Sequence, residues 1–260
     1  MKTLILAGGF GTRLSELTNV IPKPLAEIGG IPILHHIMNH YSAYGYNEFV
    51  IALGYKGHLI KDYFLNFYSR SIDFTVSLAD GVIESHSSNA FDWRVTLVDT
   101  GLNTMTGGRI KACSKFLDST FMLTYGDGVS DVNLNNLLEH HAKNDFLLTL
   151  TSVNPKSRYG LLDISESGRL NQFSEKPSLA NDWVNAGFMV AEPQIFDFID
   201  NSQTVFENIP LQTLTSHSYV GVYKHHGFWQ CMDTLREKNY LEELWSRNEA
   251  PWPQVSYPNS

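Results

Sequence analysis

Cysteine is scarce in this chain, and long apolar runs are missing. Its 260 residues include only two cysteines, Cys113 and Cys231, which lie far apart and form no Cys-x-x-Cys pair. This usage argues against a disulfide framework and favours a reducing compartment. No apolar stretch approaches the roughly 20 residues that span a bilayer, and the run Leu4–Ala7 is too short for the core of a signal peptide. We therefore expect a cytoplasmic protein without a membrane segment.

Positive charge is also in short supply. The chain has 19 Lys and Arg residues against 27 Asp and Glu residues, and its formal net charge is −8. Nonspecific nucleic-acid binders normally present a basic face, so we expect no nucleic-acid partner. A hydrophobic content of 43% and a charged content of 18% are ordinary for a soluble globular protein.

The amino-terminal segment joins a buried strand to a loop rich in glycine. The apolar run Leu4–Ala7 leads directly into Gly8–Gly11, which contains three glycines. Main-chain N–H groups in such a loop can close around anionic oxygens. Arg13 adds a fork of donors that suits phosphate, and Lys23 stands between two prolines that restrict its backbone. The segment predicts a triphosphate or pyrophosphate site; a strand followed by an ordinary turn with solvated cations remains the alternative.

This glycine loop lacks the features of two common phosphate-binding motifs. The dinucleotide pattern Gly-x-Gly-x-x-Gly is incomplete in Gly8–Gly11, and no Lys-Ser or Lys-Thr pair follows as in a P-loop. Both of those interpretations are therefore disfavoured.

Strands and helices alternate along the first part of the chain. Leu4–Ala7 and Phe49–Leu53 are typical of buried strands, and helical spacing of apolar residues follows each of them. This alternation predicts an α/β, Rossmann-like fold with a predominantly parallel mixed sheet flanked by helices. Ligands on such sheets bind beyond the carboxyl ends of the strands, where the glycine loop lies. We expect a single domain over 1–260, with a core of about 1–245 and a C-terminal tail of about 246–260 that extends along the surface or along a neighbour. Further strands are expected at 74–78, 94–98, 121–125, 146–151, 184–190 and 219–223, and a hairpin at 159–173. Helices are expected at about 31–44 and 58–67, and an exposed loop or an oligomer contact at 81–92.

Three aspartates near the predicted carboxyl ends of strands are candidates for metal ligands or helix caps. Asp127 lies between two glycines after a predicted strand, and beside a triphosphate its carboxylate would suit Mg²⁺; an Asx-type turn is the alternative. We expect Asp131 to cap the helix predicted at 134–143. Asp233 precedes a predicted helix, where an N-cap role is available to it.

A second polar loop, Asp99–Arg109, leads into another predicted helix. Two glycines, several hydroxyls and Arg109 surround the start of that helix. A helix amino terminus offers free donors to a ligand. The alternative is structural, with Thr106 as a helix cap and Arg109 as a surface charge.

Long composite motifs in the chain resemble those of a known family. The segment Leu6-Ala7-Gly8-Gly9-Phe10-Gly11-Thr12-Arg13-Leu14, followed by Pro22-Lys23-Pro24-Leu25, is similar to the signature of the sugar-1-phosphate nucleotidylyltransferases. The loop Val98–Arg109 resembles that of the cytidylyltransferase branch of the family. The resemblance extends from Met1 to about Trp252. The other matching segments are Phe173-Ser174-Glu175-Lys176-Pro177, Asn185-Ala186-Gly187 and Gly227-Phe228-Trp229 with Asp233-Thr234.

The resemblance implies an activity as well as a fold. The implied fold is that of the nucleotide-diphospho-sugar transferases. The implied reaction joins CTP and α-D-glucose 1-phosphate to give CDP-glucose and pyrophosphate, with Mg²⁺ as cofactor, in dideoxysugar and O-antigen synthesis. The family often forms homo-oligomers, and a hexamer is expected. A uridylyl- or thymidylyltransferase of the same fold, or a non-catalytic sugar-nucleotide-binding regulatory protein, remains the alternative.

Residue roles follow from the same resemblance. Catalytic roles are implied for Arg13, Lys23 and Asp127, and metal ligation for Asp127 and Asp233. The resemblance also implies that Thr104 and Arg109 contact the base, where their hydrogen bonding could separate cytosine from uracil. The expected nucleotide contacts are Leu6, Ala7, Gly8, Gly9, Phe10, Gly11, Thr12, Arg13, Lys23, Thr104, Arg109 and Gly126. The expected sugar-phosphate contacts are Tyr125, Glu175, Lys176, Asn185 and Gly187.

Overall fold

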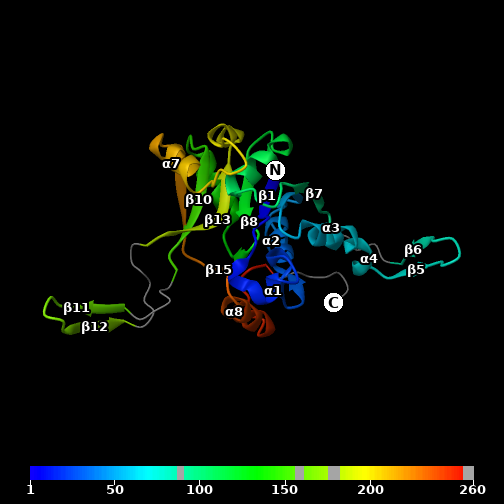
Figure 1. Ribbon diagram of the computed structural model, residues 1–260, viewed down its shortest axis with the longest axis horizontal. Helices are drawn as coiled ribbons and strands as arrows, with labels where there is room; N and C mark the ends of the chain where they lie inside the picture. The colour runs from blue at the N-terminus through cyan, green and yellow to red at the C-terminus, as the bar shows by residue number, and fades with distance from the viewer. Residues whose placement is uncertain (87–90, 156–160, 175–181, 254–260) are drawn as a thin grey trace.

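A seven-stranded sheet forms the centre of the molecule (Figure 1). The computed structural model describes residues 1–86, 91–155, 161–174 and 182–253. The strand order is β14-β10-β13-β8-β1-β4-β7, and every pairing in the sheet is parallel except those of β13. The predicted α/β fold with a predominantly parallel mixed sheet is confirmed. The strands are β1 (Lys2–Ala7), β4 (Glu48–Leu53), β7 (Arg94–Asp99), β8 (Phe121–Tyr125), β10 (Leu148–Val153), β13 (Val184–Ala191) and β14 (Val220–His225).

Apolar side chains on both faces of this sheet explain why its central strands are continuous hydrophobic runs. Successive side chains of a strand point to opposite faces, so Leu4 and Ile5 enter two different apolar clusters. Both side chains are fully buried. On one side Ile5 shares its cluster with Ile37 of α2 (Ile33–Ser42), and on the other Leu4 shares its cluster with Ile110 of α5 (Thr106–Ala112).

The described part of the chain contains eight α-helices and four short 3₁₀ turns, and all of them except α8 precede or connect strands. The helix expected at 58–67 stops at Leu65, and a separate short helix follows Asn66. Within the described ranges no helix combines the length and the apolar character needed to cross a bilayer. The helices are α1 (Ser15–Thr18), α2 (Ile33–Ser42), α3 (Gly57–Leu65), α4 (Phe67–Ser71), α5 (Thr106–Ala112), α6 (Leu134–Ala142), α7 (Ile209–Ser216) and α8 (Leu235–Ser246). The 3₁₀ turns are η1 (Thr12–Leu14), η2 (Lys23–Leu25), η3 (Ser114–Phe116) and η4 (Pro193–Phe198).

Two hairpins extend from opposite sides of the molecule in Figure 1. One pairs β5 (Phe74–Val76) with β6 (Ile83–Ser85), so the strand expected at 74–78 lies outside the main sheet and part of the expected loop 81–92 is its partner. The other pairs β11 (Leu161–Ile164) with β12 (Leu170–Ser174), which confirms the predicted hairpin. A third pair, β2 (Glu27–Ile28) with β3 (Ile31–Pro32), precedes α2.

The small pair formed by β9 (Gly128–Ser130) and β15 (Trp229–Cys231) determines where the site lies. It is antiparallel and places Cys231 opposite Gly128. The Met232 N–H extends it with a bond of 2.8 Å to the Asp127 carbonyl. Two segments about a hundred residues apart in the sequence are thereby joined, one directly after β8 and one directly before α8.

The carboxyl-terminal segment packs into the molecule rather than along its surface. Trp252 is 1% exposed, stacks on Phe228 with ring centroids 5.6 Å apart, and donates to His36 Nδ1 at 3.3 Å. The expectation of a surface tail is therefore wrong as far as Trp252, because this indole supplies apolar area that the core buries. The expected domain limits stay a prediction, and residues 254–260 lie outside the described part.

Candidate active site

The glycine loop lies where β1 ends, and its conformation is held from several sides. Gly11 has a φ of +65°, and a Cβ there would lie 2.7 Å from Thr18 Cγ2, so a larger residue is excluded. The Gly11 carbonyl accepts from the Leu14 N–H at 2.9 Å and from Thr18 Oγ1 at 3.0 Å. Around Gly9 a Cβ would meet nothing within 4 Å. The loop is thus fixed in shape and open on one side.

Lys23 lies in η2 beside this loop and is almost buried, with 9% of the residue exposed. Its ammonium donates to Asp127 Oδ2 at 2.7 Å and to Asp233 Oδ1 at 2.5 Å. Burial by itself would lower the pKa of Lys23, but the charges and hydrogen bonds of the two carboxylates outweigh burial and raise it above its ordinary value. Lys23 therefore stays charged and holds together two carboxylates that would otherwise repel.

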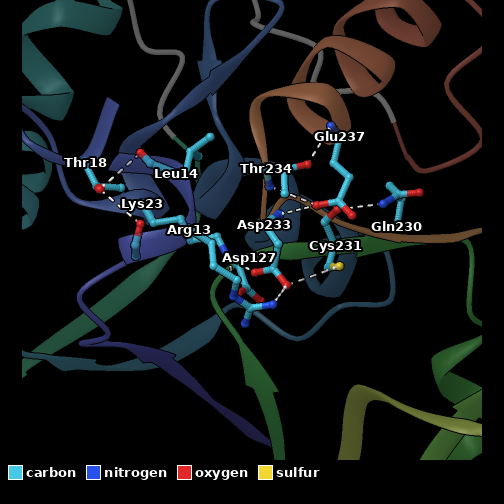
Figure 2. A network of polar contacts seen from close by, with 11 residues as sticks. Arg13, Leu14, Thr18, Lys23, Asp127, Gln230, Cys231, Asp233, Thr234 and Glu237 are labelled. Atoms are coloured by element: carbon cyan, nitrogen blue, oxygen red, sulfur yellow. Dashed lines mark hydrogen bonds and ion pairs between the residues drawn. The ribbon is translucent and has the colours of Figure 1, made fainter. Parts of the chain in front are cut away.

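Arg13 completes the charged cluster, next to Asp233 and Asp127 (Figure 2). Its Nη1 lies 2.7 Å from Asp233 Oδ2, while the Arg13 side chain is 73% exposed. The cluster of Arg13, Lys23, Asp127 and Asp233 contains two positive and two negative groups. These are the four residues for which the sequence resemblance implies catalytic or metal-binding roles. An exposed guanidinium above a buried ammonium can bind two neighbouring groups of a polyphosphate.

Asp233 points into the cluster because Thr234 and Glu237, rather than Asp233, cap the start of α8. The N-cap of α8 is Thr234, so the N-cap role considered for Asp233 is wrong. The Thr234 hydroxyl accepts from the Glu237 N–H at 3.3 Å, and Glu237 Oε2 accepts from the N–H groups of Thr234 at 2.9 Å and Asp233 at 2.8 Å. This capping box satisfies the helix start. In the sequence, the pattern Thr-x-x-Glu at 234–237 is the signal that identifies Thr234 as the N-cap.

Cys231 lies next to the cluster, and its thiol stays protonated. Burial, with Asp233 and Glu237 nearby, raises the pKa of Cys231 to about 12. Its Sγ donates toward Asp233 Oδ2 at 3.9 Å. The thiolate is the nucleophilic form of cysteine, so this residue is a poor nucleophile at neutral pH.

Asp131 does not cap α6, contrary to the sequence expectation. The N-cap is Asn133, whose side chain accepts from the Asn136 N–H at 3.0 Å. Asp131 Oδ1 instead accepts from the Phe228 N–H at 2.7 Å and lies 2.8 Å from His225 Nε2. It stabilises the turn that leads into β15, on the same strand pair that positions Asp233.

Arg109 lies inside the molecule, where it braces the glycine loop against the second polar loop. It is 5% exposed, so the alternative of a surface charge is wrong. Nη2 donates to the Gly8 carbonyl at 3.0 Å and to the Leu102 carbonyl at 3.2 Å. Nη1 donates to the carbonyls of Leu53 at 3.0 Å and Gly101 at 2.8 Å, and to Thr100 Oγ1 at 2.6 Å. Five protein acceptors thus engage the guanidinium, and its expected contact with a base stays a prediction.

The start of α5 is covered by another segment of the chain, 201–207, which sequence reasoning missed. The Met105 N–H donates to the Ser202 carbonyl at 2.8 Å, and the Gly108 N–H to the Thr204 carbonyl at 3.2 Å. A Cβ on Gly108 would lie 2.5 Å from the Ser202 carbonyl, so glycine is needed for this close approach. The expectation that these donors are free for a ligand is wrong, because a chain segment that no local pattern links to this helix occupies them.

The predicted sugar-side residues also meet. Asn185 Nδ2 donates to the Tyr125 hydroxyl at 3.4 Å, and its Oδ1 accepts from the Gly187 N–H at 2.9 Å. Gly187 has a φ of +93°, and a Cβ there would lie 2.7 Å from the Tyr125 ring. The expected contacts at Glu175 and Lys176 lie outside the described residues.

The other predicted nucleotide contacts surround the same loop. Gly126 donates its N–H to the Leu6 carbonyl at 3.0 Å, which joins the ends of β8 and β1. Phe10 is 46% exposed and lies over Tyr55 at 5.4 Å between ring centroids. Thr104 donates to the Thr100 carbonyl at 2.5 Å within the second polar loop. Their contacts with a nucleotide stay predictions.

Known proteins resemble this chain over nearly its whole length. Residues 2–230 match the family model described as nucleotidyl transferase. The chain belongs to this family. It is 47% identical over 254 residues to a glucose-1-phosphate cytidylyltransferase of Salmonella typhi, an alignment that covers 97% of this chain and 98% of the relative. It is 41% identical over 254 residues to a probable glucose-1-phosphate cytidylyltransferase of Bacillus subtilis, with 97% and 99% covered.

A solved structure supports the fold of this nucleotidyl transferase independently of close sequence similarity. A putative glucose-1-phosphate thymidylyltransferase from Bacillus anthracis, crystallised with sucrose, superposes with a TM-score of 0.72 at 15% identity. The match covers 99% of this chain and 98% of that one. The resemblance predicted from the motifs is confirmed, and so is the nucleotide-diphospho-sugar transferase fold.

The carboxylates of this nucleotidyl transferase also fit a divalent cation. Asp127 and Asp233 come from different segments and converge on one positive group, the Lys23 ammonium. Carboxylate oxygens are the ligands that Mg²⁺ prefers. The donor set and its convergence therefore suit such an ion, and metal ligation by the two residues stays a prediction.

Proposed function

We propose that this chain transfers the cytidylyl group of CTP to α-D-glucose 1-phosphate, giving CDP-glucose and pyrophosphate. The observation that carries the proposal is the 47% identity, over 97% of the chain, to a protein named glucose-1-phosphate cytidylyltransferase. The charged cluster beside an open glycine loop supports the same proposal, because a triphosphate needs main-chain donors and several cations.

The proposed chemistry is an in-line displacement at the α-phosphorus. An oxygen of the sugar phosphate forms a bond to that phosphorus, the bond to the β-phosphate oxygen breaks, and pyrophosphate leaves with the electron pair. No general base is needed, because the attacking phosphate is already ionised at neutral pH. The work of the chain is therefore to position two anions and to offset their repulsion.

Each group of the cluster has a proposed part in this work. The N–H groups of Gly8–Gly11 and the exposed Arg13 guanidinium bind the β- and γ-phosphates. Lys23 stabilises charge at the α-phosphate from its buried position. We propose that Asp127 and Asp233 hold Mg²⁺. When bound, the ion would neutralise phosphate charge and orient the oxygens around the reacting phosphorus.

Four further expectations stay predictions. They are the homohexamer, the role in dideoxysugar and O-antigen synthesis, the cytoplasmic location and the sugar-phosphate contacts of Glu175 and Lys176, which lie outside the described residues. The homo-oligomer and the pathway are carried over from the family resemblance alone.

A comparison of nucleotides tests the proposal. Purified protein is incubated with glucose 1-phosphate, Mg²⁺ and one of CTP, UTP or dTTP, and pyrophosphate release is measured. We expect the highest kcat/KM with CTP. A preference for UTP or dTTP would instead indicate a uridylyl- or thymidylyltransferase, and nucleotide binding without turnover would indicate a regulatory protein.

A further inference from the structure

Glu207 connects two parts of the site that lie far apart in the sequence. It lies half-buried in the segment between η4 and α7. Its Oε1 accepts from the Tyr125 hydroxyl at 2.5 Å, and its Oε2 accepts from the Thr106 hydroxyl at 2.5 Å. Tyr125 ends β8 on the sugar side, and Thr106 begins α5 on the nucleotide side. One carboxylate therefore contacts both.

The carboxylate determines which way the Tyr125 hydroxyl points its hydrogen. An ionised carboxylate only accepts, and a phenol has one hydrogen to donate. That hydrogen is committed to Glu207, so the Tyr125 oxygen faces its other neighbours as an acceptor. Burial, reinforced by the Glu207 charge, raises the pKa of Tyr125 above its ordinary value, and the phenol stays protonated.

The Asn185 amide has a matching orientation, with its nitrogen toward the Tyr125 oxygen. Its Oδ1 accepts from the Gly187 N–H at 2.9 Å, which identifies the other amide atom as the nitrogen, and that Nδ2 donates to the Tyr125 oxygen at 3.4 Å. Both donors of the Asn185 amide therefore lie on the Tyr125 side of the group. A ligand there meets an acceptor at Tyr125 and a donor at Asn185.

The second oxygen of Glu207 orients the nucleotide side in the same manner. The Thr106 hydroxyl gives its hydrogen to Glu207 and accepts from the Phe206 N–H at 2.9 Å. Thr106 is the first residue of α5, and the same helix carries Arg109, which donates to the Gly8 carbonyl. The position of the glycine loop is thus coupled to the carboxylate that orients Tyr125.

We propose that Glu207 is a positioning residue that fixes the hydrogen-bond direction of Tyr125 and Asn185 toward the sugar phosphate and couples them to the start of α5. Glu207 acts through these neighbours and does not touch the reacting atoms. The inference rests on the proposed function, because it assigns the sugar phosphate to the side that Tyr125 and Asn185 line.

The test uses Glu207→Gln in the full chain. The amide keeps the size of the side chain but adds a donor, so the Tyr125 hydroxyl can reverse its hydrogen. We expect KM for glucose 1-phosphate to rise about tenfold, the scale of a hydrogen bond to a charged group, with a smaller change in kcat. Unchanged KM and kcat in a folded variant would overturn the inference.

Two further variants separate positioning from general stability. Glu192→Gln is the matched control: Glu192 accepts from the Thr120 hydroxyl at 2.8 Å at the start of β8, whereas Glu207 acts at its end. We expect Glu192→Gln to leave KM unchanged. Tyr125→Phe removes the oriented hydroxyl, so adding Glu207→Gln to it should raise KM little further. Additive effects, or equal effects of the two glutamate variants, would contradict the inference.

The activity of the wild-type protein distinguishes a failure of the proposed function from a failure of the role proposed for Glu207. Absence of turnover with CTP and glucose 1-phosphate in the wild type would contradict the proposed function before any variant is made. An active wild type with a Glu207→Gln variant of identical kinetics would contradict only the role of Glu207.

Discussion

The ammonium group of Lys23 lies between two carboxylates in an almost buried position. Its 2.7 and 2.5 Å bonds to Asp127 and Asp233 hold the ends of two chain segments at one point. The sequence indicated that Lys23 and Asp127 belong to a phosphate site, from the neighbouring prolines and glycines. It left the role of Asp233 open, because residues before a helix are common N-caps. The Thr-x-x-Glu pattern from Thr234 onward would have decided this in favour of a cap one residue later.

Removing the Lys23 ammonium should affect both binding and turnover. In Lys23→Ala the two carboxylates face each other without the Lys23 cation, and the proposed contact of Lys23 with the α-phosphate is lost. We expect kcat to fall roughly 100-fold, the scale of lost transition-state electrostatics, together with weaker CTP binding. Steady-state kinetics measures both, with Lys143→Ala as the control because Lys143 makes an exposed pair with Glu139. A rise confined to KM would mean that Lys23 binds ground state and transition state equally.

At the scale of elements, Arg109 determines how closely the glycine loop approaches α5. Local patterns predicted β1, the loop and the helix that follows the second polar loop, because apolar runs, glycines and helical spacing are local signals. They did not predict that the Arg109 guanidinium engages carbonyls from three segments, or that 201–207 covers the start of α5. The contacts of Arg109 with Gly8 and of α5 with 201–207 join residues about a hundred positions apart, and no spacing rule describes them.

A pair of glycine substitutions tests this packing. A Cβ on Gly8 would lie 2.4 Å from the Arg109 guanidinium, whereas a Cβ on Gly9 would meet nothing within 4 Å. We expect Gly8→Ala to lower the free energy of unfolding by about 1–3 kcal/mol, as overpacking does. Gly9→Ala should leave it unchanged or raise it slightly. Urea unfolding compares the two, and equal stabilities would show that Arg109 moves aside freely.

In the folded molecule as a whole, one helix carries three buried histidines. His35, His36 and His40 of α2 are at most 2% exposed. Burial lowers the pKa of His35 to about 3, that of His40 to about 4, and that of His36 below its ordinary value. The sequence predicted α2 from its apolar spacing but gave no signal that these polar rings lie inside, since Trp252 and the aromatic residues that cover them come from distant segments.

The buried histidines make stability depend on pH. Unfolded histidines take up protons below about pH 6.5, whereas folded His35 and His40 stay neutral down to about pH 4. Stability is therefore fully present above pH 6.5 and is lost as the pH falls from there toward 4. We expect each such histidine to contribute a slope approaching about 1.4 kcal/mol per pH unit within that window. Urea unfolding at pH 7.5, 6 and 5 measures it, and a flat profile would contradict neutral buried histidines.

The central claim is that two distant carboxylates and one buried lysine form the catalytic centre of a nucleotidyl transferase. Pyrophosphate release from CTP and glucose 1-phosphate by Asp127→Asn, compared with the wild type at saturating Mg²⁺, tests it most directly. The account predicts a folded variant whose turnover is lower by roughly 100-fold or more. Turnover at the wild-type rate by the folded Asp127→Asn variant would contradict it.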